Sequence, residues 1–343
     1  MKIIRINPFE HYTLPPSVCA LGYFDGLHRG HQQLIQAALT QAEKLGMESA
    51  VLSFDPDPWR VLRPQSDLFH LSDLHDKAFM LAAMGVDLFY VVTFSKEFAG
   101  WSNERFHEFL AGLNIQEIVC GFDYTYGRKG SGTTETLSKA FEGHVHVIEQ
   151  IQSEHAKISS SRIEALVEAG EMRKAAELLG SFYSIRGTVT HGYQRGRQLG
   201  FPTANLGFSS EEILPASGVY AGYVQSGTRF LPAMINVGRN PTFNNKKKTV
   251  EAFILDFHED IYGKPVRFFF ADRLRQEIRF ASPEDLADQL ERDAKATRPA
   301  LEPLKDLLEA TEKLWRAKPE IDEESLQALA APAESEDADP AGQ

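Results

Sequence analysis

The chain has 343 residues, of which 43% are hydrophobic and 24% are charged. This composition is typical of a globular protein and excludes a fibrous or wholly disordered chain, and the length is sufficient for two domains with separate cores. The formal net charge is −12, but eight acidic residues and no lysine or arginine follow Pro319, which leaves −4 for residues 1–318. Nothing in this charge balance suggests general nucleic-acid binding, which requires a basic face.

The start of the chain and its cysteines bear on where the protein works. No apolar run approaches the roughly 18 residues that cross a bilayer, and MKIIRINPFEHY lacks the apolar core of a secretory signal. Only Cys19 and Cys120 occur, each inside an apolar run, so we expect two buried thiols rather than a disulfide or a thiolate metal cluster. These features predict a cytoplasmic protein that does not contact a membrane.

The first half of the chain alternates predicted strands with predicted helices. Residues 17–24 form a short apolar run that includes Gly22 and is followed by Asp25. Residues 31–45 place their apolar side chains on one helical stripe before Gly46. The alternation continues with predicted strands at 49–54, 87–94 and 116–121. It predicts an α/β first domain over residues 1–180, with a mostly parallel sheet whose ligands bind at the carboxyl ends of the strands.

From residue 181 the pattern changes to short strands separated by turn residues, which predicts an antiparallel sheet or a small barrel. A final helix is expected from Ser282, a capping residue followed by proline. We therefore predict a second domain over residues 181–310. Residues 319–343 are rich in alanine, proline and acid, which predicts a disordered tail.

The stretch GYFDGLHRGH, residues 22–31, lies where a strand passes into a helix. Two imidazoles three residues apart and the free N–H groups of a helix N-terminus converge on one point there, and that arrangement attracts phosphate. Gly26 and Gly30 permit a tight turn and the close approach of a bulky anion. Such a site can hold a nucleoside triphosphate and stabilise charge on a transferred phosphorus atom. Two histidines without a third ligand are a weak metal signal.

Three further stretches carry polar groups suited to ligands. ISSSRI (158–163) precedes a helix and is either a second phosphate contact or a plain serine cap. GFDYTYG (121–127) offers aromatic rings to a flat ligand, or is a simple hairpin. FPTAN (201–205) offers a hydroxyl and an amide oxygen to Mg²⁺ beside ATP phosphates, or is an ordinary turn; the glycines and arginines of 191–200 then form a basic flap over phosphate.

In order and spacing these stretches resemble the motifs of bacterial bifunctional riboflavin kinase/FAD synthetases, from about residue 15 to about residue 295. The resemblance implies a Rossmann-like nucleotidyltransferase sheet and a six-stranded riboflavin-kinase barrel followed by a helix. It implies that riboflavin is phosphorylated by ATP to FMN, and that FMN then receives AMP from ATP to give FAD and pyrophosphate, with Mg²⁺. Small-molecule substrates are expected; transient self-association and a partner for the acidic tail are open.

The resemblance also assigns residues to the two reactions. It makes His28 and His31 catalytic in adenylyl transfer and Glu251 catalytic in phosphorylation, where the carboxylate orients or deprotonates the ribityl hydroxyl. For adenylyl transfer it assigns to ATP the residues Gly22, Phe24, Asp25, Gly26, His28, His31, Ser159, Ser160, Ser161 and Arg162. To the flavin of that reaction it assigns Phe54, Asp123, Tyr124 and Tyr126. For the kinase it assigns to ATP the residues Gly192, Arg195, Gly196, Arg197, Gly200, Thr203 and Asn205, the last two also to Mg²⁺. To the flavin of the kinase it assigns Asn236, Glu251 and Arg275.

One position departs from the family pattern. Where the family commonly has Phe-Asp-Pro-His-Pro, this chain has FDPDP, with Asp57 in place of histidine. A carboxylate beside a triphosphate repels it unless a metal ion intervenes. Asp57 leaves open a riboflavin kinase with an impaired adenylyltransferase site and a flavin-binding regulatory protein. A transferase for a different acceptor also stays open, because domains with the HxGH motif act on several small molecules.

Overall fold

The computed structural model describes residues 1–64, 69–153, 156–191, 200–209, 212–239, 248–315 and 321–330. The chain divides into two compact units. The first comprises Met1–Leu68, Ser72–Gln152 and Lys318–Gln343, and the second comprises Phe69–Leu71 and Ser153–Ala317. No helix in the described ranges is both long enough and apolar enough to cross a membrane.

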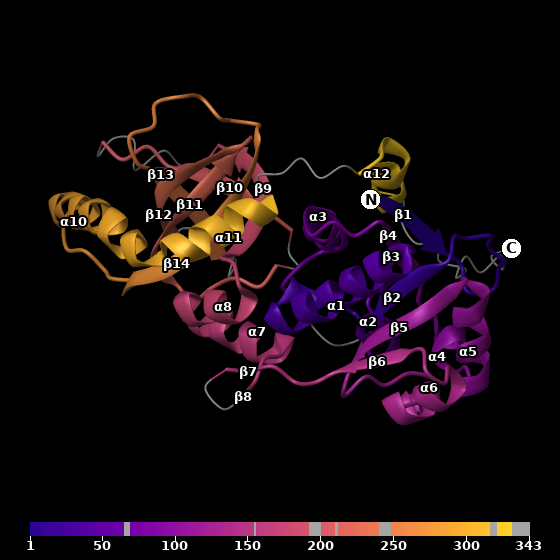
Figure 1. Ribbon diagram of the computed structural model, residues 1–343. Helices are drawn as coiled ribbons and strands as arrows, with labels where there is room; N and C mark the ends of the chain where they lie inside the picture. The colour runs from indigo at the N-terminus through magenta and orange to yellow at the C-terminus, as the bar shows by residue number, and fades with distance from the viewer. Residues whose placement is uncertain are drawn as a thin grey trace, which may run out of the picture. The chain divides into compact units, whose positions relative to one another are not determined.

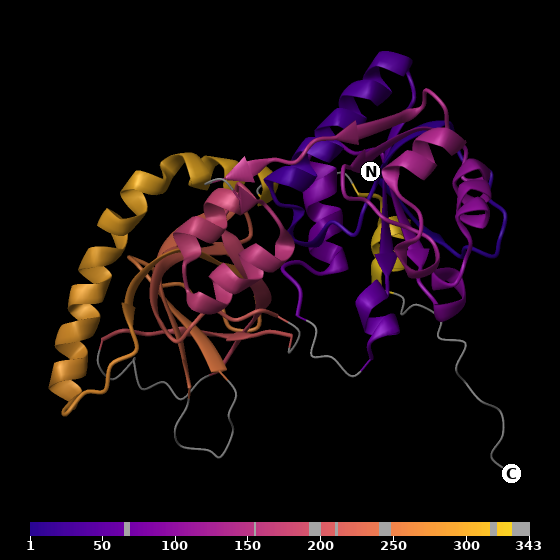
Figure 2. The same ribbon diagram turned by 90° about the horizontal axis from the view of Figure 1, so that it is seen from below.

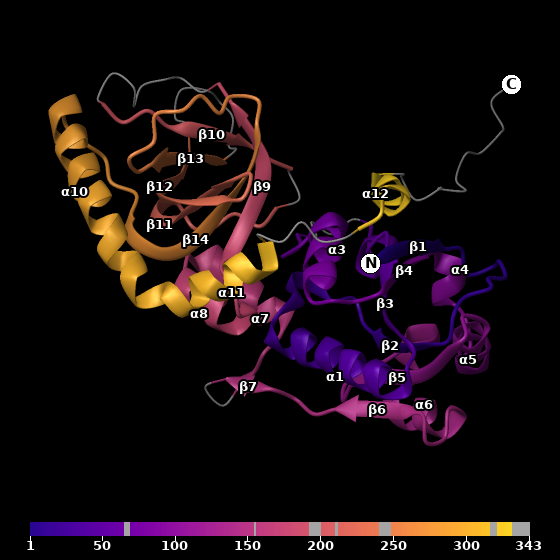
Figure 3. The ribbon, with the colours of Figure 1, turned by 45° about the horizontal axis from the view of Figure 1, so that its top comes forward.

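A six-stranded sheet forms the centre of the first unit, with the strand order β1-β4-β3-β2-β5-β6 and only parallel pairings (Figures 1 and 3). The strands are β1 (Lys2–Ile6), β2 (Ser17–Leu21), β3 (Glu48–Asp55), β4 (Leu88–Thr93), β5 (Ile115–Gly121) and β6 (Val145–Ile148). All five residues of β2 are buried, as expected for a central strand that is covered on both faces. The predicted parallel sheet is confirmed.

Helices cover both faces of this sheet. They are α1 (Arg29–Leu45), α2 (Pro58–Leu62), α3 (Leu74–Ala83), α4 (Lys96–Ala99), α5 (Asn103–Gly112) and α6 (Thr134–Ala140). Helix α1 packs across β2, β3 and β5. On the other face, Phe98, Phe106 and Leu110 of α4 and α5 pack in one cluster with alternate residues of the strands, Cys19 and Cys120 among them. Both cysteines are buried and free, as predicted.

The strand order locates the place where ligands of such a sheet bind. The chain passes from β2 to β3 and β4 on one side and later adds β5 and β6 on the other side of β2. The order therefore reverses between β2 and β5, and the carboxyl ends of strands at such a reversal form the usual ligand crevice.

The second unit contains a closed antiparallel barrel with the strand order β10-β13-β12-β11-β14-β9. The strands are β9 (Tyr183–Thr190), β10 (Ala204–Gly207), β11 (Gly218–Ser226), β12 (Arg229–Arg239), β13 (Lys248–Ile254) and β14 (Pro265–Gln276). At Gly222 of β11 an added Cβ would lie 2.0 Å from the carbonyl oxygen of Phe269 on β14, so only glycine permits that approach. The predicted six-stranded barrel is confirmed.

Helix α8 (Met172–Leu179) packs against β9 and β14 of the barrel, and helix α7 (Ser160–Ala169) packs against α8. The guanidinium group of Arg273 on β14 donates hydrogen bonds to the carbonyl oxygens of Ala169 (3.3 Å) and Ser217 (2.6 Å). Between the sheet and the barrel the division into compact units falls at Gln152/Ser153, whereas the boundary predicted from the sequence lies at residues 180/181. Short strands β7 (Gln152–Ser153) and β8 (Ala156–Lys157) lie at this junction.

Two helices follow the barrel, α10 (Pro283–Leu301) and α11 (Lys305–Trp315). Ser282 caps α10, because its hydroxyl oxygen accepts a hydrogen bond from the N–H of Asp285. Helix α10 runs along the outside of the barrel against β11, β12 and β14 (Figure 2). The predicted final helix is confirmed.

The structure differs from the expected disordered tail at α12 (Glu323–Ala330). Asp322 accepts a hydrogen bond from the N–H of Ser325 (2.7 Å), which starts the helix. The Ser325 hydroxyl oxygen, which is buried, accepts from the N–H of Ile3 (2.7 Å). Ile3 lies in the edge strand β1, so this helix satisfies a backbone donor that an edge strand would otherwise leave open.

Candidate active sites in the two units

The turn after β2 has an unusual backbone. Phe24, Gly26 and Leu27 have φ angles of 57°, 71° and 38°. These angles lie in the left-handed region, which residues other than glycine usually avoid. Ser72 secures the turn: its hydroxyl oxygen accepts from the N–H of Gly26 (2.8 Å), while its own N–H donates to the Asp25 carboxylate (3.1 Å). The predicted residues Gly22 to Gly26 therefore form a fixed loop at the carboxyl end of β2.

His28 and His31 lie side by side at the start of α1. Their rings stack with centroids 3.6 Å apart and 15° between planes. The Nδ1 atom of His28 accepts a hydrogen bond from the N–H of His31 (3.3 Å), which leaves the proton of the neutral ring on Nε2. A Cβ added to Gly30 would lie 3.1 Å from Cε1 of His28. The absence of a side chain at Gly30 thus leaves room for the His28 ring.

Three predicted segments meet at the reversal of strand order. GYFDGLHRGH follows β2, Phe54 and Asp57 come at the end of the neighbouring β3, and residues 121–127 follow β5 on the other side. Because adjacent parallel strands end at the same edge, the structure brings these segments to the crevice that the sequence predicts. The Phe54 ring packs edge to face against Phe94 with centroids 5.5 Å apart.

The two tyrosines of GFDYTYG have different environments. The Tyr126 ring stacks on Phe106 (centroids 4.9 Å apart), and its hydroxyl group lies 2.7 Å from His107 Nε2. Tyr126 is therefore a buried support of the loop. The Tyr124 ring stacks beside the Tyr126 ring, with centroids 6.0 Å apart. Burial raises the pKa of the Tyr124 hydroxyl group. The preceding residue, Asp123, is exposed.

Asp57 has a structural partner that the sequence does not reveal. Its carboxylate caps α2 by accepting from the N–H groups of Trp59 (2.5 Å) and Arg60 (3.1 Å). Burial, and after it the neighbouring Asp57 carboxylate, raise the pKa of Tyr23. The carboxylate is thus held by backbone donors of a helix start, and a metal ion is not needed to keep it in place.

The ISSSRI stretch forms the start of α7 in the second unit. Ser159 caps the helix through the N–H of Arg162 (3.4 Å). The Arg162 guanidinium group donates to the carbonyl oxygens of Ser153 (3.1 Å) and Ala156 (3.3 Å). Both alternatives from the sequence therefore retain a basis: a serine cap, and a helix start with a fixed cation and the hydroxyls of Ser160 and Ser161.

Strand pairing sets the predicted kinase residues in one row across the barrel. Asn205 lies opposite Glu251, Glu251 opposite Asn236, Asn236 opposite Val219, and Val219 opposite Arg275. The strand neighbours of the first three residues are buried. Because strand side chains alternate between faces, Asn205, Glu251 and Asn236 point away from the barrel core.

A pocket of about 500 Å³ adjoins this row, a size within the usual range for small-molecule sites. Thr203 and Asn205 line it, together with Phe257–Tyr262. The Thr203 hydroxyl group donates to the Glu251 carboxylate (3.2 Å). The pocket-lining segment 257–262 was not predicted from the sequence, although its residues, FHEDIY, combine aromatic and acidic groups shortly after a strand. Gly200 lies among the described residues, whereas Gly192, Arg195, Gly196 and Arg197 lie outside them.

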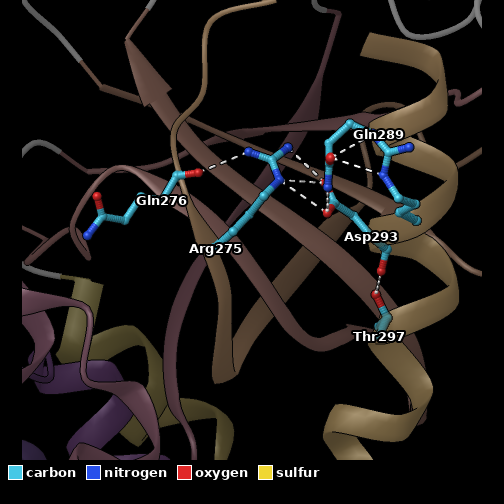
Figure 4. A network of polar contacts seen from close by, with 6 residues as sticks. Arg275, Gln276, Gln289, Asp293 and Thr297 are labelled. Carbon is cyan, nitrogen blue, oxygen red and sulfur yellow. Dashed lines mark hydrogen bonds and ion pairs between the residues drawn. The ribbon is translucent and has the colours of Figure 1, made fainter. Parts of the chain in front are cut away.

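Arg275 joins β14 to α10 (Figure 4). Its Nε and Nη2 atoms each lie 2.8 Å from Oδ2 of Asp293, and its Nη1 atom donates to the carbonyl oxygen of Gln276 (3.0 Å). Asp293 is buried and also accepts from Gln289 (2.8 Å). The arginine that the sequence places at the flavin thus holds the end of β14 against the helix.

Comparisons with known proteins also distinguish two modules in the chain. A family model described as FAD synthetase matches residues 11–162, and one described as riboflavin kinase matches residues 179–301. The bifunctional riboflavin kinase/FMN adenylyltransferase of Listeria monocytogenes is 39% identical over 302 residues, which are 87% of this chain and 96% of the relative. This chain belongs to that family. The resemblance stated from the motifs is confirmed.

Other relatives extend the agreement. The family member from Bacillus subtilis is 38% identical over 303 residues, which cover 85% of this chain and 96% of the relative. A crystal structure described as a macrolide-efflux protein from Streptococcus pneumoniae has a TM-score of 0.81 and 37% identity, and the match covers 86% of this chain and 98% of that chain. The fold and the order of the two modules are therefore those of the family.

Proposed function

We propose that this chain makes FAD from riboflavin in two ATP-dependent steps, one in each compact unit. The observation that carries the proposal is that each unit presents its own arrangement for phosphate: stacked histidines at the start of α1, and Thr203 bonded to Glu251 beside a pocket. Membership of the family supports both activities. We also place the protein in the cytoplasm, where its two free cysteines stay reduced.

In the barrel the ribityl hydroxyl oxygen of riboflavin attacks the γ-phosphorus of ATP. The new O–P bond forms as the bond to the bridging oxygen breaks, giving FMN and ADP, and Glu251 accepts the hydroxyl proton. Asn236 lies beside Glu251 in the row and contacts the flavin, while Arg275 fixes the strand end from which the flavin is reached.

The oxygen atoms of Thr203 and Asn205 fit Mg²⁺, which prefers hard oxygen ligands and substrate phosphates. When bound, the ion neutralises charge on the phosphates of ATP. We assign to ATP also Gly200 and the residues Gly192, Arg195, Gly196 and Arg197 of the predicted flap.

In the first unit a phosphate oxygen of FMN attacks the α-phosphorus of ATP, and pyrophosphate leaves. His28 donates through Nε2, and His31 and the N–H groups of the turn add donors to the same phosphate oxygens, so no covalent intermediate on the protein is needed. We assign Phe54, Asp123 and Tyr124 to the flavin and give Tyr126 a supporting role. Gly22, Phe24, Asp25 and Gly26 are assigned to ATP. Ser159–Arg162, which the resemblance also assigns to this ATP, belong to the second compact unit.

The experiment follows products by chromatography after the protein receives ATP and Mg²⁺ with either riboflavin or FMN. FAD from both substrates is the expected result. FMN from riboflavin without any FAD would instead indicate a kinase with an impaired transferase site. Consumption of ATP only with another acceptor, or flavin binding without ATP consumption, would overturn the proposal.

A further inference from the structure

Lys77 is a buried lysine beneath the phosphate-binding turn. It lies in α3, and its side chain is 2% exposed, although lysine is almost never fully buried without a partner. Its Nζ atom lies 3.5 Å from the centroid of the Tyr23 ring. Tyr23 directly precedes the strained turn that leads to His28, so the ammonium group contacts the turn from the side of the protein core.

Four carboxylates act on this ammonium group. Burial lowers the pKa of Lys77 to about 8, and Asp25, Asp57, Asp73 and Asp55 oppose that shift. Asp55 forms an ion pair with Arg5 at 2.7 Å. Asp73 caps α3 by accepting a hydrogen bond from the N–H of Asp76.

Asp25 and Asp57 lie in the same part of the structure as Lys77. Asp25 belongs to the turn, and Asp57 forms a hydrogen bond with Tyr23, over whose ring the ammonium group lies. Both carboxylates are buried. A triphosphate that approaches the turn therefore meets their negative charge, and the buried ammonium group of Lys77 acts against it, as does Arg60 of α2, which also acts on Tyr23.

We propose that Lys77 is the internal counter-ion of the adenylyl-transfer site, a positioning residue that balances Asp25 and Asp57 and so lets an anionic nucleotide approach the turn. This inference rests on the proposed adenylyl transfer in the first unit. It accounts for the presence of Asp57 where the family commonly has histidine. The additional carboxylate is tolerated because the ammonium group of Lys77 offsets its charge.

The test compares five variants by their KM for ATP and kcat in FAD formation from FMN, with riboflavin phosphorylation by the same samples as an internal control. Lys77→Met raises the KM for ATP about tenfold with a smaller change in kcat. Lys77→Arg keeps the charge and stays close to the parent. In Lys77→Met/Asp57→Asn the KM returns toward the parental value, because one negative charge is removed with the positive one. Lys44→Met, an exposed lysine of α1 in the same unit, is the matched control and leaves the KM unchanged.

Asp57→Asn alone keeps the test decisive if Lys77→Met does not fold, since asparagine also caps helices. It lowers the KM for ATP about threefold relative to the parent. The inference is overturned if Lys77→Met leaves the KM for ATP unchanged. It is also overturned if Asp57→Asn does not reverse the increase in KM caused by Lys77→Met, or if Asp57→Asn alone raises the KM. If the parent forms no FAD from FMN at all, the proposed function fails first; if it forms FAD and the variants behave like the parent, only the role of Lys77 fails.

Discussion

Gly30 shows at the scale of one residue how the phosphate site depends on a missing side chain. The sequence predicts close approach of an anion at this glycine, whereas the structure shows that the His28 ring occupies the space where a Cβ would project. The motif thus singles out Gly30, and the coordinates add that the His28 ring lies where its side chain would project. The sequence does contain an indication of Lys77. It lies among the buried positions of α3 with Ala78 and Leu81, and a charged residue is unusual on the apolar face of a helix.

Replacing Gly30 with alanine moves the His28 ring without weakening the helix. The new Cβ lies 3.1 Å from Cε1 and 3.2 Å from Nδ1 of His28, so the ring shifts by a few tenths of an ångström. Alanine is a better helix former than glycine, so the substitution does not weaken α1. We expect kcat for FAD formation to fall about tenfold, with the thermal midpoint unchanged or higher. Gly112→Ala in α5, where a Cβ meets nothing within 4 Å, is the control. A parental kcat in Gly30→Ala would show that the ring position is not critical.

The protonation of Lys77 can be observed directly. Burial lowers its pKa to about 8, so the group is charged below pH 8 and neutral above it. Because the unfolded chain keeps this proton to higher pH, the contribution of Lys77 to stability increases as the pH rises from about 8 toward the ordinary value. In ¹³C-lysine NMR spectra, one resonance that is absent from Lys77→Met is expected to titrate near pH 8. Titration of that resonance together with the surface lysines would contradict the burial described here.

At the scale of elements, the strand–helix alternation and the barrel strands could be predicted because their apolar periods are regular. The edge strands β1 and β6 were missed, since a short edge strand lacks a long apolar run. Helix α7 was foreseen as a helix, but its packing partner was not: the contacts of Arg273 with Ala169 and Ser217 join residues far apart in the sequence. The same limit applies to Arg275, whose partner Asp293 lies in the following helix.

Removing the carboxylate of Asp293 tests the junction of β14 and α10. Asp293→Ala leaves the partly buried Arg275 without its bidentate partner, which typically costs about 3 kcal/mol. We expect a lower unfolding midpoint for the barrel and slower riboflavin phosphorylation, with parental FAD formation from FMN. Glu291→Ala on the same helix is the control, since its ion pair with Lys295 is exposed and such pairs contribute little. Equal midpoints for the two variants would contradict the role given to this pair.

At the scale of the whole molecule, each unit has its own core and its own candidate site. The acidic tail belongs to the first unit through α12, which contacts β1. Composition predicted disorder for the whole tail and could not reveal this helix, because its contact with Ile3 lies at the opposite end of the chain.

Deleting residues 319–343 is expected to leave both activities at the parental level, because none of the residues assigned to either site lies in this segment. The deletion removes the buried hydrogen bond between Ser325 and Ile3, typically worth about 1 kcal/mol, so the thermal midpoint of the first unit should fall by a few degrees. Activity assays and thermal unfolding of the shortened chain check both statements. Loss of either product would show that the tail takes part in catalysis.

The independence of the two sites is the central claim, and product chromatography of two variants tests it most directly. Given riboflavin, ATP and Mg²⁺, the His28→Ala/His31→Ala variant should accumulate FMN and form no FAD. Given FMN instead, Glu251→Gln should form FAD at the parental rate, although it makes no FMN from riboflavin. If the histidine variant still forms FAD, if Glu251→Gln still phosphorylates riboflavin, or if either variant loses both products while folded, the assignment of one reaction to each unit is wrong.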